Sequence, residues 1–387
     1  MQTYFLKPNE TRIAPKESSA YRMAVDLLDK ASIKINGENP WDMQLHHTRV
    51  PDQAFARGNL GLGEAYMAGE WDADQLDEFF CRLLATKLTD QIQPIRLLGH
   101  VLASKFLDRQ NVQRARKVGE IHYDLGNDFY EHMLDSRMTY TCGYWENANN
   151  LEQAQNAKLD LVCRKLRLKP GMRVLDIGCG WGSFMAYAAE HYGVEAVGVS
   201  ISKQQIAWAK QRYPHLPLEF RLQDYRDIDE QFDAIASIGM FEHVGRKNYR
   251  TYMRVAHQAL KNDGLFLLHT IGKNMRRSAP DPWIDKYIFP NGDLPSIGQI
   301  GDAADDLFRV EDLHNFGADY DKTLMAWFKK FHDSWPFFAE RLGPRFYRMW
   351  KYYLLSCAGA FRARDIQLWQ WVLSKDGVRD GYRREKI

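Results

Sequence analysis

Short apolar segments alternate with helical segments through the middle of this chain, and this alternation limits the fold more than any other feature. Strands separated by helices build βαβ units, which form a parallel sheet covered by helices. We therefore predict an α/β fold, with residues 365–373 as a last strand at the edge of the sheet. The predicted strands are 173–177, 195–199, 218–222, 232–238 and 264–269, and the predicted helices are 181–191, 203–212 and 249–260.

The whole chain divides into three parts by composition. Residues 1–92 read as a small, mainly helical N-terminal domain, with a helix over 21–32 and glycines at 58, 61, 63 and 69 punctuating an aromatic stretch. Residues 93–118 read as a linker that ends in a basic patch, Arg109 to Lys117. Residues 119–387 hold the predicted sheet and form the catalytic domain in this interpretation.

Composition excludes several classes of protein. With 45% hydrophobic and 26% charged residues, the chain is neither disordered nor collagen-like, and its formal net charge of +2 argues against a nucleic-acid binder. No apolar run is long enough to span a bilayer, and the N-terminus lacks the pattern of a signal peptide. Five scattered cysteines without a CxxC pair argue against disulfides or a zinc site. We expect a cytoplasmic protein with free thiols and no bound metal.

The sharpest motif is a glycine-rich turn after the strand at 173–177. Gly178, Gly180 and Gly182 follow the acid Asp176, and Ser183 stands where a dinucleotide-binding loop would have its third glycine. This pattern resembles motif I of class I S-adenosylmethionine (SAM) methyltransferases. The glycines would let the backbone approach the co-substrate, and Asp176 would orient the loop or favour the cationic ligand. A purely structural strand-to-helix turn is the alternative.

Polar residues also follow the next two strands. Ser200 and Gln205 come after the second strand, where many SAM enzymes carry an acid for the ribose. Asp224 and Tyr225 come after the third strand, the usual place for adenine contacts. The resemblance therefore implies SAM contacts at these four residues.

Several longer segments narrow the resemblance to one family. Together they resemble the bacterial cyclopropane-fatty-acyl-phospholipid synthases over nearly the whole chain, including the extra N-terminal domain that the shorter mycolic-acid enzymes lack. The set is more specific than any single motif because its members occur in order. The segments are His122–Phe129, Met138–Trp145, Gly239–Gly245, Leu267–Gly272, Phe289–Gly292, Asn315–Tyr320 and Cys357–Arg362.

The resemblance implies a set of catalytic residues. In this family a bicarbonate ion lies beside the sulfonium methyl, and the matching positions here are Glu242, His269, Tyr320, Cys142 and the backbone of Ile271. Further SAM contacts are implied at Tyr140 and at Thr141, which replaces the expected Ser and keeps its hydroxyl. Cys357 matches a cysteine once proposed as catalytic, but the reaction has no covalent enzyme intermediate, and we favour a place in the wall of the acyl tunnel.

Each of these residues has a plainer alternative. Glu242 could cap the helix that follows it, and His269 ends an apolar strand, where a core histidine is common. Tyr320 could be a packing residue, and the two cysteines could be small buried apolar groups.

The implied reaction transfers a methylene from SAM to a cis double bond of an acyl chain in a membrane phospholipid. The implied partners are the unsaturated phospholipid, met by peripheral association with the inner face of the cytoplasmic membrane, and a second copy of the chain in a homodimer. The basic patch could meet anionic head groups at about 1 kcal/mol per charge, or could be a plain solvated linker. The open alternatives are a SAM methyltransferase without ring closure and a non-catalytic lipid-binding protein on the same fold.

Overall fold

The computed structural model describes residues 18–87, 125–276 and 280–384. The predicted linker 93–118, its basic patch and the start of the predicted catalytic domain at 119 lie outside these residues, as does the first part of the His122–Phe129 segment. The division into domains at these boundaries therefore stays a prediction.

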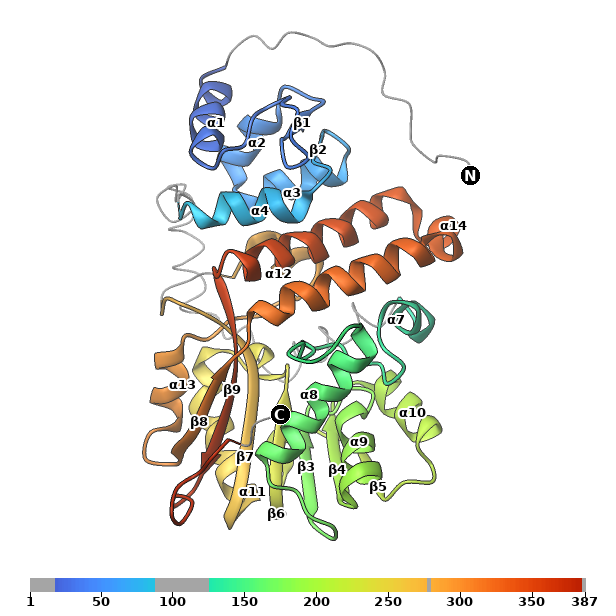
Figure 1. The fold of residues 1–387 in the computed structure, drawn as a ribbon, viewed down its shortest axis with the longest axis vertical. Helices are drawn as coiled ribbons and strands as arrows, with labels where there is room; N and C mark the ends of the chain where they lie inside the picture. Colours follow the sequence, from blue (N-terminus) through green and yellow to red (C-terminus); the bar gives the residue numbers. More distant parts are fainter. Residues whose placement is uncertain (1–17, 88–124, 277–279, 385–387) are drawn as a thin grey trace.

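A seven-stranded mixed sheet forms the centre of the larger part of the molecule (Figure 1). The strand order is β5-β4-β3-β6-β7-β9-β8, and the first five strands of this order run parallel. The chain moves outward in opposite directions from β3 and β6, so a crevice forms where these two neighbours end. The strands are β3 (Arg173–Ile177), β4 (Glu195–Ser200), β5 (Leu218–Leu222), β6 (Phe232–Ile238), β7 (Leu260–Lys273), β8 (Arg309–Asn315) and β9 (Ile366–Ser374).

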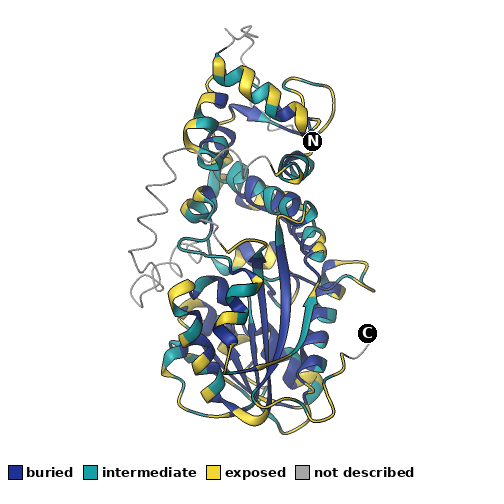
Figure 2. Ribbon diagram, turned by 90° about the vertical axis from the view of Figure 1, so that its left-hand side faces the viewer, coloured by how far each residue is buried: buried dark blue, intermediate teal, exposed yellow. Residues whose placement is uncertain are grey.

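Helices cover both faces of the sheet, and the strands between them are buried (Figure 2). One apolar core joins a face of the sheet to α8 (Leu151–Lys165), α9 (Ser183–Tyr192) and α10 (Lys203–Arg212). The other core joins the opposite face to α11 (Tyr249–Ala259) and α13 (Ile297–Ala304). The three-layer α/β fold predicted from the alternation is thus confirmed.

The prediction of an edge strand over residues 365–373 is wrong in its placement. The strand exists as β9, but it lies between β7 and β8 and pairs antiparallel with both. The edge is instead β8, which the sequence reading missed because its residues are mostly half-buried or exposed and polar. An interior position explains why nearly every residue of β9 is buried.

The N-terminal unit is mainly helical, as predicted, with one short antiparallel pair of strands. Its elements are α1 (Ser19–Lys30), β1 (Gln44–Leu45), α2 (Val50–Arg57), α3 (Asn59–Met67), β2 (Trp71–Asp72) and α4 (Leu76–Ala85). Gly61 and Gly63 lie inside α3 and do not punctuate it. A Cβ at Gly61 would lie 2.1 Å from the Gln53 carbonyl oxygen, and one at Gly63 would lie 2.5 Å from the Trp283 ring. Both glycines therefore permit close packing.

A long helical hairpin lies between the N-terminal unit and the sheet (Figure 1). It is α14 (Ala318–Arg362), which folds back on itself at Gly343, where φ is +72°. The two arms run side by side, because the rings of Tyr320 and Phe361 stack 4.5 Å apart and Arg362 forms an ion pair with Asp321. Short helices α7 (Asn127–Met133) and α12 (Pro282–Tyr287) pack beside it.

Aromatic packing and polar contacts attach the N-terminal unit to this hairpin. Phe80 and Trp283 pack against Tyr352, whose hydroxyl donates to Asn59. Arg362 also pairs with Asp77 at 2.8 Å, so one guanidinium ties α14 to α4.

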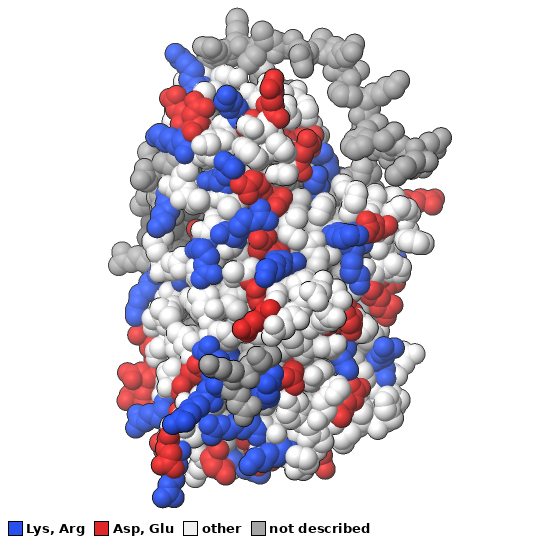
Figure 3. Space-filling model, in the orientation of Figure 1, with Lys and Arg blue, Asp and Glu red and all other residues white. Residues whose placement is uncertain are grey.

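The surface and the thiols fit the expectations from composition. Basic and acidic side chains of the described residues are interspersed on the face in Figure 3. All five cysteines carry free thiols. Among the described residues, no helix combines the length and the apolar character needed to cross a bilayer.

A close approach of α14 to α4 at Gly359 predicts a sensitive position. A Cβ at Gly359 would lie 2.4 Å from the Asp77 carbonyl oxygen, so Gly359→Ala must push α4 away from α14. We expect a loss of about 1–3 kcal/mol in the free energy of unfolding, measured by urea denaturation. The matched control is Gly301→Ala in α13, where a Cβ would meet nothing within 4 Å. Equal stability of the two variants would contradict this account.

Candidate active site

A cavity of about 1820 Å³ opens at the carboxyl ends of the parallel strands and continues to the N-terminal unit. At the sheet, its walls come from the turns after β3, β4, β5 and β6 and from β7. At the other end, apolar side chains of α1, α2, α3 and α4 line it, among them Leu27, Phe55, Leu62, Phe79 and Leu83. One space therefore joins a polar end to an apolar end.

The glycine loop forms part of the polar end. Gly178 has φ +85°, and a Cβ there would lie 2.6 Å from Met240 Cγ, so the position requires glycine. The Gly178 N–H donates to the Val199 carbonyl, which fixes the loop against β4. Gly180 lines the cavity with φ +55°. Gly182 does not line it; its missing Cβ makes room for the Phe220 ring, so this glycine serves the packing of α9 on the sheet.

Asp176 lies beneath this loop beside a buried lysine. Asp176 is 3% exposed, and burial raises its pKa to about 7, an effect that Lys158 opposes. Lys158 is also buried, which lowers its pKa to about 8, and its ammonium donates to the Thr141 hydroxyl at 2.9 Å. Lys158 therefore interacts electrostatically with Asp176, the acid of the glycine loop, and forms a hydrogen bond to the Tyr140–Thr141 segment.

Asp135 holds that segment in place. Its carboxylate accepts from the Thr139 N–H at 2.7 Å and from the Arg137 N–H at 3.1 Å. Further along, the Tyr140 hydroxyl lies 3.0 Å from the Tyr353 hydroxyl of α14. Because both tyrosines line the cavity, this contact closes one side of it.

The predicted residues after β4 and β5 also line the cavity. Ser200 Oγ donates to Gln205 Oε1 at 3.4 Å, and the Gln205 side chain lies close to Gly180. Asp224 accepts from the Arg226 N–H at 3.0 Å and so orders the short turn that carries Tyr225. The structure thus brings together all the predicted SAM contacts except Gly182, which lies behind the wall.

Glu242 follows β6 in a single 3-10 turn, Phe241–His243, and does not cap a helix by its side chain. Its Oε1 accepts from the Ile271 N–H of β7 at 2.7 Å, and its Oε2 is buried without a hydrogen-bond partner among the described residues. The Thr270 hydroxyl donates instead to the Ile271 carbonyl. Burial raises the pKa of Glu242 to about 7, and the Ile271 bond opposes that rise.

His269 lies two residues before Ile271 on β7, opposite Ile238, and both of these neighbours line the cavity. Its Nδ1 is 3.1 Å from Gln370 Nε2, while its Nε2 is buried and meets no hydrogen-bond partner in the described part of the chain. Burial lowers the pKa of His269 well below its usual value, so the imidazole is neutral.

Tyr320 lines the cavity from the start of α14. Burial raises the pKa of its hydroxyl, and the nearby Cys142, Glu242, Tyr140 and Cys357 add to the rise. These five residues therefore lie close together, whereas His269 does not itself line the cavity.

The two cysteines differ in their surroundings. Cys142 is fully buried, does not line the cavity, and donates to the Gly143 carbonyl at 3.1 Å. Cys357 lines the cavity, and burial raises its pKa to about 12. Neither thiol is a thiolate near neutral pH, so neither has the form of a nucleophile.

Sequence reasoning missed the residues that support the site from behind. Lys158, Asp135 and Gln370 bond to predicted site residues or to their segments, and Lys165 bonds to Gln370. Only the lysines had a usable signal, since each occurs on the apolar face of a predictable helix, where an ammonium needs a buried partner.

Comparisons with known proteins agree with this geometry. Residues 110–371 match the family model described as mycolic acid cyclopropane synthetase. The cyclopropane-fatty-acyl-phospholipid synthase of Escherichia coli strain K12 is 50% identical over 376 residues, which cover 96% of this chain and 97% of the relative.

Two solved structures share the fold. Mycolic acid cyclopropane synthase CmaA1, complexed with SAH and CTAB, has a TM-score of 0.64 and 34% identity, over 67% of this chain and 98% of that one. Coclaurine N-methyltransferase bound to N-methylheliamine and SAH has a TM-score of 0.68 at 23% identity, over 81% of this chain and 99% of that one. The predicted class I SAM-methyltransferase fold is confirmed.

The raised pKa of Glu242 predicts a stability that falls with pH. The unfolded chain releases this proton near pH 4.5, whereas the folded protein keeps it up to about pH 7. The protonated Glu242 carboxyl therefore makes its full contribution to the free energy of unfolding below pH 4.5, and this contribution is lost as the pH rises through 7. In carbonate-free buffer, the stability of Glu242→Gln relative to wild type should increase by about 3 kcal/mol between pH 4.5 and 8.

Urea denaturation at several pH values measures this difference. Glu340→Gln, on the exposed side of α14, is the control and should show no such change. A constant difference between Glu242→Gln and wild type would show that the carboxyl ionises normally in the fold.

Proposed function

The chain belongs to the mycolic acid cyclopropane synthetase family, and from that premise we propose that it transfers a methylene from SAM to the cis double bond of unsaturated acyl chains in membrane phospholipids. The observation that carries this proposal is one continuous cavity, which joins the glycine loop and Glu242 to an apolar passage beneath the N-terminal unit. A polar, cationic co-substrate and a hydrocarbon chain need such adjoining spaces.

SAM would occupy the polar end. Gly178 and Gly180 let the backbone approach it, Gln205 and Ser200 offer polar contacts to the ribose, and Asp224 and Tyr225 lie at the adenine side. Tyr140 and Thr141 would close the site over the methionine part, and Asp176 would favour the positive charge through the loop.

The nucleophile in this reaction is the alkene, which is weak, and the reaction proceeds in two steps. The π electrons of the alkene form a C–C bond to the SAM methyl while the C–S bond breaks, which leaves S-adenosylhomocysteine and a carbocation on the acyl chain. The methyl-derived carbon loses one proton, and its electron pair closes the three-membered ring. The sum is alkene plus SAM giving cyclopropane, S-adenosylhomocysteine and a proton.

The bicarbonate ion implied by the resemblance fits some of the residues present. Glu242 Oε2 and His269 Nε2 are buried polar atoms without hydrogen-bond partners in the part of the chain that the structure describes, as the polar atoms of an ion site would be. The Ile271 N–H and the Cys142 thiol, by contrast, donate to Glu242 and to the Gly143 carbonyl. We therefore propose Glu242, His269 and Tyr320 as the residues that hold the ion. When bound, the ion would supply the base for the departing proton.

The protein's own residues set the conditions for that proton transfer. Glu242 titrates near pH 7 because it is buried, so it can hold or release a proton at its free oxygen at little cost. Tyr320, with its raised pKa, stays a neutral donor. The aromatic rings of Tyr140, Tyr320 and Phe361 line the cavity and can stabilise a cation without trapping it. Cys357 would contact the acyl chain as a neutral thiol.

The remaining parts of the proposal concern the membrane. The N-terminal domain, 1–92, would dock the protein on lipid, because its apolar side chains continue the cavity beyond the sheet. We place the protein in the cytoplasm, peripherally at the inner face of the cytoplasmic membrane, and propose a homodimer, which would double the docking points.

The test uses purified protein, SAM and vesicles of cis-unsaturated phospholipid, with and without bicarbonate, and NMR of the extracted lipid. We expect cyclopropane protons at high field and a rate that falls when bicarbonate is removed. Glu242→Gln should lower turnover at least tenfold, about 1.4 kcal/mol in the barrier, while SAM affinity changes little. Glu340→Gln is again the control.

Other products would revise the proposal. A methyl-branched or unsaturated product would indicate a SAM methyltransferase without ring closure. SAM binding without turnover would leave a different acceptor or a lipid-binding protein. A wild-type rate for Glu242→Gln would remove this residue from the ion site.

A further inference from the structure

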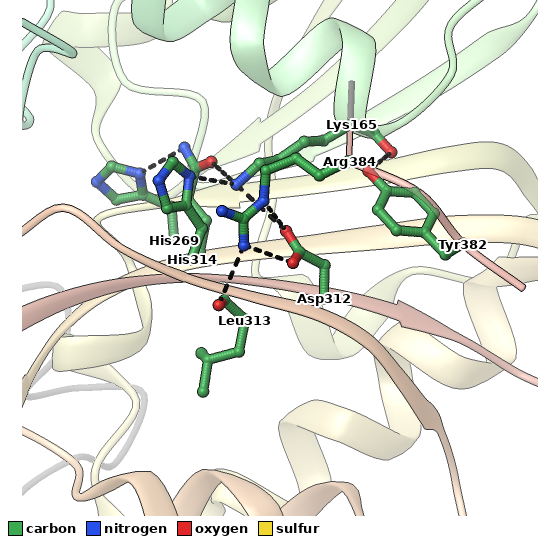
Figure 4. A network of polar contacts seen from close by, with 8 residues as sticks. Lys165, His269, Asp312, Leu313, His314, Tyr382 and Arg384 are labelled. Atoms are coloured by element: carbon green, nitrogen blue, oxygen red, sulfur yellow. Dashed lines mark hydrogen bonds and ion pairs between the residues drawn. The ribbon is translucent and has the colours of Figure 1, made fainter. Parts of the chain in front are cut away.

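Three polar side chains lie in a row across three neighbouring strands behind the proposed ion site (Figure 4). His269 of β7 is the register partner of Gln370 of β9, and Gln370 is the register partner of His314 of β8. Lys165, at the end of α8, reaches this row from the helix that covers it. Lys165, His269, His314 and Gln370 thus form one polar cluster between the cavity and the C-terminal residues 382–384.

Hydrogen bonds connect the row without a break. The Lys165 ammonium donates to Gln370 Oε1 at 2.8 Å and lies 3.1 Å from His314 Nδ1. Gln370 Nε2 lies 3.1 Å from His269 Nδ1. Lys165, Gln370 and His269 are each no more than 2% exposed, so water cannot substitute for these bonds.

The donor and acceptor roles in this row can be assigned in order from Lys165. An ammonium only donates, so the atom of Gln370 that faces it must be the carbonyl oxygen. The Gln370 amide nitrogen then faces His269 and must donate, so His269 Nδ1 accepts and carries no proton. A neutral imidazole has one N–H, and it must therefore lie on Nε2, which has no hydrogen-bond partner within residues 18–87, 125–276 and 280–384.

Two properties of the groups set the conditions for this assignment. Burial holds the pKa of His269 well below its usual value, so the ring has a single proton to place. Burial also lowers the pKa of Lys165 to about 7, and a neutral amine can accept a hydrogen bond as well as donate one. The assignment therefore applies below pH 7, where Lys165 is an ammonium.

The end of the chain holds Lys165 in this position. Asp312 of β8 lies 3.7 Å from the Lys165 ammonium and pairs with Arg384, whose guanidinium also donates to the Leu313 carbonyl. The Tyr382 hydroxyl donates to the Lys165 carbonyl at 3.0 Å. Asp312 therefore supplies the counter-charge of Lys165 and shares it with Arg384, while Tyr382 bonds to the lysine backbone.

We propose that Lys165 and Gln370 are positioning residues that hold His269 in the Nε2–H tautomer and so present an N–H donor to an anion beside Glu242. The role in turnover rests on the proposed function, because the anion is part of it; the tautomer itself does not. The neutral His269 would then bind the anion without protonating it, which leaves the anion free to act as a base. A histidine with the opposite tautomer would offer a lone pair and repel it.

The tautomer can be measured in the wild-type protein without substrates. The protein is labelled with ring-¹⁵N histidine, and long-range ¹H–¹⁵N correlations identify the protonated nitrogen of each of the 12 histidines. The His269 signal is assigned as the one missing from His269→Asn. At pH 6, where Lys165 is charged, we expect Nε2 to be protonated and Nδ1 to be bare. A proton on Nδ1, or on both nitrogens, at this pH would overturn the proposal.

Matched variants test the positioning role. Gln370→Met removes the donor to His269 at similar volume, and Gln367→Met makes the same change at a buried residue of the same strand that bonds to Arg364 and Asn315 instead. For Gln370→Met we expect a mixture of His269 tautomers and at least a tenfold lower kcat, with SAM affinity within about twofold of wild type. For Gln367→Met we expect the wild-type tautomer and kcat.

The outcomes separate this inference from the proposed function. A Gln370→Met protein with wild-type tautomer and kcat, or a Gln367→Met protein with the same losses as Gln370→Met, would overturn the positioning role. If Gln370→Met does not fold, Lys165→Met, which frees the Gln370 amide to turn, must give the mixed tautomers. A wild-type protein that has the Nε2–H tautomer but makes no cyclopropane would refute the proposed function alone.

Discussion

Two buried polar atoms that have no hydrogen-bond partner among the described residues, Glu242 Oε2 and His269 Nε2, are the constraint on which the site depends. Burying an unpaired polar group costs about 1–3 kcal/mol, so the fold bears this cost twice, in the turn after β6 and on the neighbouring strand β7. The carboxyl responds by titrating near pH 7, and the imidazole responds by staying neutral. Both protonation states suit residues that bind a small polar ligand, because such a ligand would form hydrogen bonds with the two atoms.

The sheet explains how these atoms come together. Glu242 follows β6, His269 lies on β7, and the bond between Glu242 and the Ile271 N–H joins the two elements where the cavity begins. On the far side of His269, the register of β7, β9 and β8 aligns Gln370 and His314. The antiparallel pairing of β9 with β7 therefore brings the side-chain amide of Gln370 to Nδ1 of His269, behind the proposed ion site.

The sequence predicted most of this arrangement but not all of it. The strands after which the glycine loop, Ser200 and Asp224 occur have strong apolar signals, and their bounds agree with the structure to within a residue. The interior place of β9 was not predictable, because its partner β8 is polar and gives no strand signal. The roles of Lys158, Lys165 and Gln370 depend on which side chains meet across strands far apart in the chain, and local patterns do not contain that information. The α14 hairpin was not predicted either; its turn at Gly343 lies between Pro336 and Pro344, a residue type that usually interrupts a helix.

Binding of the ion itself tests the central claim most directly. ¹³C NMR of labelled bicarbonate, titrated with protein that holds S-adenosylhomocysteine, reports the bound ion without requiring turnover. The account predicts one bound bicarbonate in wild type and at least tenfold weaker binding in Glu242→Gln, at unchanged affinity for S-adenosylhomocysteine. Equal binding in both proteins, or none in wild type, would contradict the assignment of the two free atoms to an ion.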